Sequence, residues 1–266
     1  MKKFVHDFIV ISNKRLNSNH FVLELLSPEP LSTMEPGQFA EVLINGSQDV
    51  FLRRPFSIHN ADRQKNTISL FIKIVGKGTH ALSIVQKGEK LNLIYPLGKG
   101  FRLPAHEKIL VVGGGCGIAP LLFLVHTLHD RGVKSDIILG ARSAGDLLIT
   151  QQFSRYGNMF LMTEDGSAGE KGLVTQHSMF SKGSFAYQTI FGCGPTPMLK
   201  ALDKIATAFG IECQVSLENT MACGIGACLC CVVKTTTGNR CVCTEGPVFD
   251  TRELDGWYQP IAKCYR

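Results

Sequence analysis

The sequence predicts three parts: a small antiparallel β-barrel, an α/β domain with a parallel sheet, and a short cysteine-rich C-terminal domain. Short, evenly spaced strand patterns in the first hundred residues predict the barrel. Strand and helix patterns that alternate from Lys108 onward predict the α/β domain. Six of the ten cysteines lie between Met221 and Phe249. We expect domain boundaries at 1–103, 104–213 and 214–266.

The composition is that of a globular, intracellular protein. The chain has 266 residues, of which 44% are hydrophobic and 19% charged. Its longest apolar runs are too short to span a membrane, and its start resembles a first strand more than a signal peptide. The net charge of +6 is scattered along the chain, so it gives no support to a nucleic-acid role. Many unpaired cysteines favour a reducing cytoplasm.

Alternating apolar residues between turn signals define the barrel strands. Turn signals include Glu35-Pro36-Gly37 and Asn45-Gly46. One short helix, Thr79–Val85, interrupts the strands, and we expect Thr79 to be its N-cap. The expected strands are Phe4–Ile11, Phe21–Leu26, Gln38–Ile44, Phe56–His59, Thr67–Ile74 and Lys90–Tyr95.

Two stretches of the barrel suggest a bound cofactor. In Arg53–Ile58 (RRPFSI), an arginine, an aromatic ring and a hydroxyl on one strand can meet a phosphate, a flat ring and a ring heteroatom. In Gly76–Thr79, a glycine turn opens a helix whose free N–H groups favour an anion. Each stretch also has a plain structural interpretation, as an exposed arginine pair or an ordinary turn.

From Lys108 the pattern becomes a βαβ series. A continuous apolar strand is followed by a glycine loop and then by a helix with Pro120 in its first turn. The expected strands are Lys108–Val112, Asp136–Leu139, Met159–Thr163, Thr189–Phe191 and, as the last one, Gln214–Leu217. The expected helices are Ala119–His129 and a second one from Gly194-Pro195 to about Phe209.

Two glycine-rich loops end strands of this sheet. Gly113–Pro120 lacks the G-x-G-x-x-G dinucleotide spacing, but it remains a strand-to-helix turn that can receive a pyrophosphate. Phe191–Pro195 ends a second strand. Because ligands bind at the carboxyl ends of parallel strands, we expect both loops at one site. Cys193 in the second loop is either a core thiol or a ligand contact.

The cysteine-rich segment predicts an iron–sulfur cluster. Cys223, Cys228 and Cys231 have the C-x4-C-x2-C spacing of a plant-type [2Fe–2S] loop, with small residues in the gaps. Cys241 or Cys243 supplies the fourth thiolate after a turn around Gly238-Asn239. A zinc knot fits this spacing less well, and a disulfide framework is typical of small secreted chains.

These motifs, in this order, resemble the ferredoxin–NADP reductase superfamily, and within it the electron-transfer subunits of NAD-linked (type 1B) dihydroorotate dehydrogenases. The ending of Met221–Phe249, which reads CTEGPVF, is similar to the family's fourth-ligand motif and favours Cys243 over Cys241. Phe56 stands where many members of the superfamily have tyrosine. The resemblance rests on Leu52–Ser57, Gly78-Thr79, Pro96–Gly98, Gly113–Pro120, Cys193–Met198 and Met221–Phe249.

The resemblance implies an oxidoreductase subunit of pyrimidine biosynthesis. A partner subunit oxidises dihydroorotate on FMN, and electrons then cross a [2Fe–2S] cluster and FAD to NAD, typically in a heterotetramer. No catalytic acid or base is expected in this chain. The implied metal ligands are Cys223, Cys228, Cys231 and Cys243. The implied cofactor-binding residues are Arg54, Pro55, Phe56, Ser57, Phe71, Ile72, Lys73, Gly78, Thr79, Gly114, Gly115, Gly117, Cys193, Gly194 and Pro195.

Three hypotheses stay open at this point. Small subunits of NADH-dependent ferredoxin:NADP oxidoreductases and of sulfide dehydrogenases share these motifs, and a redox sensor without turnover is a third class. The choice of NAD over NADP comes from the family, since Arg142 after a sheet strand suits a 2′-phosphate equally well. Trp257 and Tyr258 are candidate anchors for a partner or for the C-terminal tail.

Overall fold

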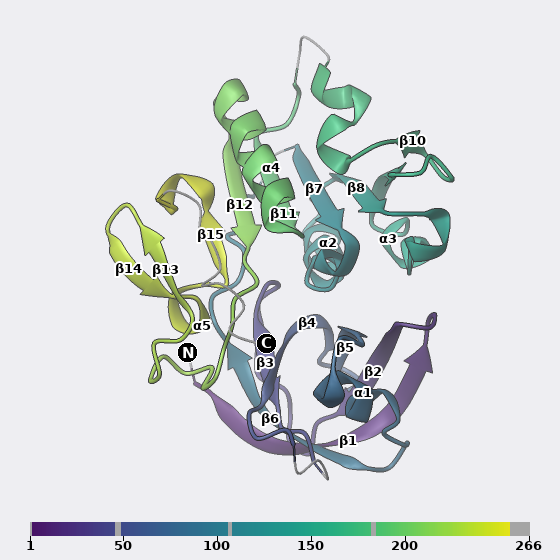
Figure 1. The fold of residues 1–266 in the computed structure, drawn as a ribbon, viewed down its shortest axis with the longest axis vertical. Coiled ribbons are helices and arrows are strands. Elements are labelled where there is room, and N and C mark those ends of the chain that lie inside the picture. Colours follow the sequence, from purple (N-terminus) through teal and green to yellow (C-terminus); the bar gives the residue numbers. More distant parts are fainter. Residues whose placement is uncertain (1, 46–48, 106–107, 182–184, 256–266) are drawn as a thin grey trace.

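The computed structural model describes residues 2–45, 49–105, 108–181 and 185–255, and places them in a closed barrel, a seven-stranded sheet and a small hairpin region (Figure 1). Trp257 and Tyr258 lie outside the described residues. Within the described ranges, no helix has the length and apolar character needed to cross a membrane.

Six antiparallel strands close the barrel in the order β1-β2-β5-β4-β3-β6, which confirms the predicted architecture. Apolar side chains such as Phe8, Phe21 and Leu70 fill its interior. β1 runs past its predicted end because the polar residues Asn13–Arg15 continue the antiparallel pairing with β2. The strands are β1 (Phe4–Arg15), β2 (His20–Leu26), β3 (Phe39–Val42), β4 (Arg54–Asp62), β5 (Thr67–Lys73) and β6 (Lys90–Leu97).

The helix between β5 and β6, α1 (Lys77–Ser83), begins earlier than predicted, and Thr79 is not its N-cap. Gly76 occupies the cap, and Thr79 lies in the first turn. The Thr79 hydroxyl accepts hydrogen bonds from the N–H groups of Val75 (2.9 Å) and Gly76 (3.1 Å). The threonine therefore ties down the segment that enters the helix, which is the reciprocal half of a capping box.

The α/β domain is a sheet in the order β10-β9-β8-β7-β11-β12-β15 (Figure 1). Along β7, Ile109 and Val111 pack on one face, whereas Leu110 and Val112 pack on the other. The strands are β7 (Ile109–Gly114), β8 (Ser135–Ala141), β9 (Gly157–Thr163), β10 (Glu170–Lys171), β11 (Thr189–Cys193), β12 (Glu212–Ser216) and β15 (Val248–Asp250).

Helices cover both faces of this sheet. Leu121, Leu124 and Leu128 of α2 pack in one apolar cluster, and Leu199 and Leu202 of α4 pack in the cluster on the opposite face. The α-helices are α2 (Leu121–Asp130), α3 (Thr150–Phe153) and α4 (Thr196–Phe209). Four 3-10 helices accompany them in the described part of this domain: Gly115–Ile118, Ala144–Asp146, Val174–Gln176 and Ser178–Ser181.

The edge of the sheet departs from the prediction. The strand expected to be last is β12, but one more strand, β15, lies beside it in the sheet. β15 pairs antiparallel with β12 through Val215 and Phe249. The sheet is therefore parallel except at this edge. The expected boundary after residue 213 falls inside β12, which belongs entirely to the sheet. The cysteine-rich region thus contributes a strand to the domain that precedes it.

The rest of that region is a two-stranded hairpin and a single helical turn. β13 (Val232–Thr235) pairs with β14 (Gly238–Cys241), α5 (Val242–Glu245) follows, and a 3-10 helix covers Thr251–Glu253. The turn lies at 236–237 instead of Gly238-Asn239, because Thr235 and Gly238 already face each other as the last paired residues. The Thr235 hydroxyl closes this turn by donating to the Gly238 carbonyl oxygen at 2.6 Å.

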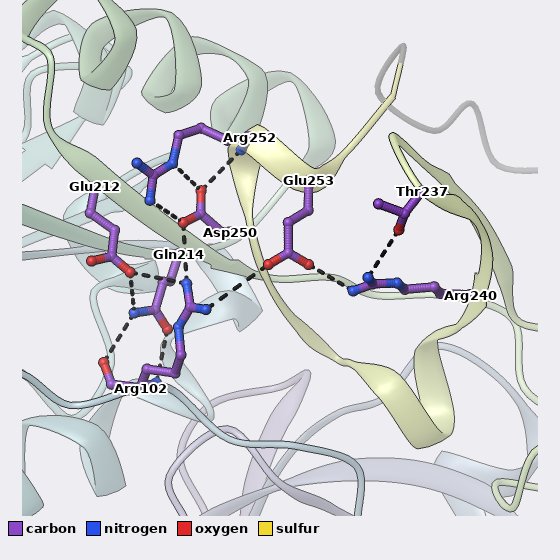
Figure 2. Close-up of polar contacts among 8 residues, drawn as sticks. All are labelled: Arg102, Glu212, Gln214, Thr237, Arg240, Asp250, Arg252 and Glu253. Carbon is purple, nitrogen blue, oxygen red and sulfur yellow. Dashed lines mark hydrogen bonds and ion pairs between the residues drawn. The ribbon is translucent and has the colours of Figure 1, made fainter.

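A network of charged groups joins the three parts of the chain (Figure 2). Arg102, in the segment between barrel and sheet, contacts Glu212 of β12 at 3.1 Å and Asp250 of β15 at 3.2 Å. Glu253 pairs with Arg240 of β14 at 2.8 Å. The network therefore links the cysteine-rich hairpin and the segment that follows the barrel to the same edge of the sheet.

Candidate redox-cofactor sites

The two glycine loops meet at the carboxyl ends of β7 and β11, as expected. Gly113 and Cys193 are register partners on these strands. A Cβ atom on Gly117 would lie 2.1 Å from the Cys193 carbonyl oxygen, and one on Gly114 would lie 2.6 Å from Met198 Sδ. Only glycine allows the loops to approach so closely. Gly194 and Pro195 complete the second loop and lead into α4.

The predicted flavin residues lie on two paired strands, β4 and β5. Arg54, Pro55, Phe56 and Ser57 start β4 and are partly buried. Arg54 passes close to Gly78, because a Cβ atom on Gly78 would lie 3.5 Å from Arg54 Nε. A strand arginine and the glycine turn are therefore brought together, which is the arrangement a phosphate group needs.

The three residues predicted on β5 have different surroundings. Phe71 is buried against the α/β domain. Ile72 is buried inside the barrel, so only its backbone faces outward. Lys73 is exposed at the end of the strand. Phe71 also lies between two imidazole rings, with centroid distances of 5.6 Å to His20 and 5.7 Å to His59.

Two groups that the sequence did not single out, Glu218 and Cys116, lie near the predicted residues Lys73 and Cys193. Partial desolvation raises the pKa of the Glu218 carboxyl although the residue is exposed, and Lys73 opposes that shift. Burial also raises the pKa of the Cys116 thiol, which lies 3.6 Å from His20 Nε2. Burial and Glu218 both raise the pKa of Cys193, so this cysteine is a neutral core thiol at the mouth of the site. Cys116 and Glu218 follow β7 and β12, and their place after strand ends was the signal that could have found them.

The cysteine-rich loop brings its thiols together as two pairs. The Cys228 N–H donates to Cys223 Sγ, and the Cys243 N–H donates to Cys231 Sγ, both at 3.4 Å. Among the described residues, no three imidazole, thiol or carboxyl groups converge as a single-ion site would need. Two pairs suit a cluster with two irons, because each iron takes two protein ligands.

The two remaining cysteines of the segment differ in position. Cys230 is exposed, whereas Cys241 is buried at the end of β14 and its thiol also interacts with Cys231. The two candidates for the fourth ligand, Cys241 and Cys243, do not lie on the same strand. Cys241 ends the strand and Cys243 lies in α5, because the chain turns into a helical turn after Cys241.

Electrostatics differ between the two thiol pairs. Burial raises the pKa of Cys223, but the N–H groups of Ile225 and Cys228 outweigh it and lower that pKa to about 6. Burial and the Cys231 thiol raise the pKa of Cys243 to about 12. The exposed pair thus has backbone donors ready for a thiolate. In the buried pair, burial outweighs the backbone donor from Gly226, so this pair favours a cation that neutralises it.

The cysteine-rich region packs on the outer face of the barrel. Cys231, Val242 and Cys243 share one apolar cluster with Phe39 of β3 and Leu97 of β6. Backbone contacts reinforce this packing, since the Lys99 N–H donates to the Gly246 carbonyl oxygen at 2.5 Å. On the opposite side of the loop, Ile225 and Leu229 are 46% and 63% exposed. The loop is therefore fixed to the barrel on one side and open on the other.

Family models match two parts of the chain. Residues 7–101 match an oxidoreductase FAD-binding domain, and residues 218–255 match the iron–sulfur cluster binding domain of dihydroorotate dehydrogenase B. Among solved structures, the NADH-dependent reduced ferredoxin-NADP oxidoreductase is similar with a TM-score of 0.84 and 28% identity, covering 94% of this chain and 90% of that one. A ferredoxin reductase of carbazole 1,9a-dioxygenase shares the fold, with a TM-score of 0.69 over 79% of this chain and 67% of that one at 20% identity.

Barrel, sheet and thiol pairs together define an oxidoreductase subunit with an FAD-binding domain and an iron–sulfur domain. Proteins named electron transfer subunit of dihydroorotate dehydrogenase B (NAD(+)) are similar over nearly their whole length. The Fusobacterium nucleatum protein is 35% identical over 94% of this chain and 98% of its own, and the Desulforamulus reducens protein is 37% identical over 94% and 98%. This chain belongs to that family of electron transfer subunits.

Proposed function

We propose that this chain carries electrons from a partner subunit that oxidises dihydroorotate on FMN to NAD, using a [2Fe–2S] cluster and FAD. The curated relatives support this proposal by their name, electron transfer subunit of dihydroorotate dehydrogenase B (NAD(+)). A heterotetramer of two copies of each subunit is part of the proposal. The free cysteines of the described residues suit the reducing cytoplasm in which we place it.

One observation carries the proposal: strand β3 pairs with the candidate flavin strand and also packs against the candidate cluster site. Phe39 of β3 is the register partner of Ser57 of β4. The Phe39 side chain also packs in the apolar cluster that holds Cys231 and Cys243. A single strand thus separates the thiols from the flavin strand, and a short path between two redox centres is what an electron relay requires.

The residues fit the groups they would hold. When bound, FAD supplies the exchange between two-electron hydride chemistry and the one-electron chemistry of a cluster. Arg54 and the Gly78-Thr79 turn would hold its phosphates, Phe56 would lie against the flat ring, and Ser57 would hydrogen-bond the ring edge. Phe71, Ile72 and Lys73 of β5 would complete the FAD-binding surface. Because hydride transfer needs positioning more than proton transfer, these side chains bind and orient.

The loops at the sheet's carboxyl edge would hold NAD. Gly114, Gly115 and Gly117 would receive the pyrophosphate, and Cys193, Gly194 and Pro195 would border the nicotinamide. The buried Cys193 keeps water from this mouth. Cys223, Cys228, Cys231 and Cys243 would ligate the cluster, and the exposed Ile225 and Leu229 beside them would face the partner subunit.

Reconstitution with the FMN-containing partner tests the proposal. The isolated chain should contain about two irons, two sulfides and one FAD, as that cluster type requires. It should oxidise NADH with an artificial acceptor but ignore dihydroorotate. The reconstituted pair should reduce NAD with dihydroorotate. Turnover of dihydroorotate by the isolated chain, or stoichiometric zinc without sulfide, would contradict the proposal.

A further inference from the structure

Glu41 is a carboxylic acid buried where the barrel meets the cysteine-rich loop. It lies in the middle of β3, where Ala40 and Val42 point into the barrel core. Since side chains alternate along a strand, Glu41 points outward, on the face that the loop covers. Its exposed fraction is 0%. A side chain that points outward from a barrel strand is normally exposed to solvent. The cysteine-rich loop therefore buries Glu41.

The covering residue is Gly224, between the candidate ligands Cys223 and Cys228. Gly224 has a left-handed backbone with φ +67. A Cβ atom there would lie 2.6 Å from Glu41 Cγ and 2.9 Å from Glu41 Oε1. The loop backbone therefore rests directly on the carboxyl group, and the glycine makes that contact possible.

Neither carboxyl oxygen of Glu41 has a hydrogen-bond partner among the described residues. The Arg53 guanidinium is engaged elsewhere: it donates to the backbone carbonyl oxygens of Glu41 (3.4 Å) and Asn92 (2.9 Å) and to Asn92 Oδ1 (2.5 Å). Burial raises the pKa of Glu41 to about 7, against the opposing effect of Arg53. This carboxyl group thus loses its hydration without gaining a bond.

Such a group destabilises the fold. An unpaired buried polar group costs about 1–3 kcal/mol, and more when it is charged. An apolar side chain of similar size would pack in the same place without that cost. Buried polar groups without hydrogen-bond partners concentrate at functional sites. Here the neighbouring function is the cluster loop.

We propose that Glu41 is a positioning residue of the cluster site, whose buried carboxyl group lowers the reduction potential of the iron–sulfur cluster held by the adjoining loop. The inference rests on the proposed function, since it takes the four cysteines as ligands. A negative charge in a poorly solvated place opposes the arrival of an electron nearby. A low cluster potential suits a carrier whose electrons must continue to NAD.

The test is a redox titration of iron-loaded protein carrying Glu41→Gln, followed by electron paramagnetic resonance at about pH 9, well above the ordinary pKa of a carboxyl group. The amide keeps the shape of the side chain and removes its charge. We expect a more positive midpoint potential, with unchanged iron content. Glu29→Gln, at an exposed position of the same domain, is the matched control and should leave the potential unchanged.

Thermal unfolding separates this role from a structural one. Because Glu41 makes no carboxyl hydrogen bond, Glu41→Gln and Glu41→Leu should unfold at or above the temperature of the unaltered protein. An unchanged potential in Glu41→Gln would overturn the inference, as would loss of iron from both variants. If the unaltered protein bound no iron, the proposed function itself would be wrong. That result differs from an unchanged potential in iron-loaded Glu41→Gln, which would contradict only the role of Glu41.

Discussion

The carboxylate of Asp250 in β15 accepts a hydrogen bond from Arg102, which lies 148 residues earlier in the segment between barrel and sheet. Asp250 is buried, and it also accepts from the Arg252 backbone N–H at 3.0 Å and side-chain Nε at 2.9 Å. Burial alone would raise its pKa, but Arg252 and Arg102 lower it overall. One carboxylate thus ties the cysteine-rich region to the segment between barrel and sheet (Figure 2).

We expect Asp250→Asn to destabilise the protein by about 2 kcal/mol at neutral pH, because charged hydrogen bonds at a buried acceptor are lost. Since the folded pKa of Asp250 is depressed, its contribution is present above the unfolded pKa and disappears as pH falls through the folded pKa. The deficit of the variant should therefore shrink in acid. Denaturant unfolding across pH measures it, and a deficit independent of pH would contradict the assignment.

Cysteine substitutions test the ligand set. Replacing Cys223, Cys228, Cys231 or Cys243 by serine should remove the cluster, because each candidate iron would lose one of its two protein ligands. Cys230→Ser and Cys241→Ser are the matched controls and should keep it. Iron and sulfide analysis with the visible spectrum provides the measurement. Retention of the cluster in Cys243→Ser together with its loss in Cys241→Ser would move the fourth ligand to Cys241.

Gly117→Ala tests the contact between the two glycine loops. Its Cβ atom would lie 2.1 Å from the Cys193 carbonyl oxygen, so the loops must separate. We expect kcat/KM for NADH, with an artificial acceptor, to fall at least tenfold, or about 1.4 kcal/mol. Gly145→Ala is the control, because its nearest neighbour would be 3.9 Å away and its backbone needs no glycine. Equal activity of both variants would show that the loops do not form the NAD site.

The choice of nucleotide gives a further prediction. We expect NADH to be preferred over NADPH by at least tenfold in kcat/KM, about 1.4 kcal/mol in transition-state binding. Arg142 follows β8 as an exposed side chain and offers the one opposing argument, since it could bind a 2′-phosphate. Steady-state kinetics with both nucleotides decides the matter. A preference for NADPH would favour a function like that of the ferredoxin-NADP oxidoreductase.

Local patterns in the sequence were sufficient for much of the architecture. The order of strands and helices, the two glycine loops and the cysteine spacing all depend on residues close together in the chain. For residues close in the chain, backbone geometry alone sets their relative positions, through the side-chain period of strands and helices and through tight turns. The barrel and the α/β sheet could therefore be predicted, together with the segment that supplies the thiol pairs.

Contacts between distant residues were decided only in the tertiary structure. In the sequence, Glu41 is one residue of the expected strand Gln38–Ile44, and its burial under Gly224 is visible only in the tertiary structure. Likewise, β15 pairs with β12 and Asp250 binds Arg102, although these residues are far apart in the chain. The periodicity of strands and helices does not predict such contacts. Such features depend on which faces pack together, and the free energy that selects those faces is summed over the whole chain.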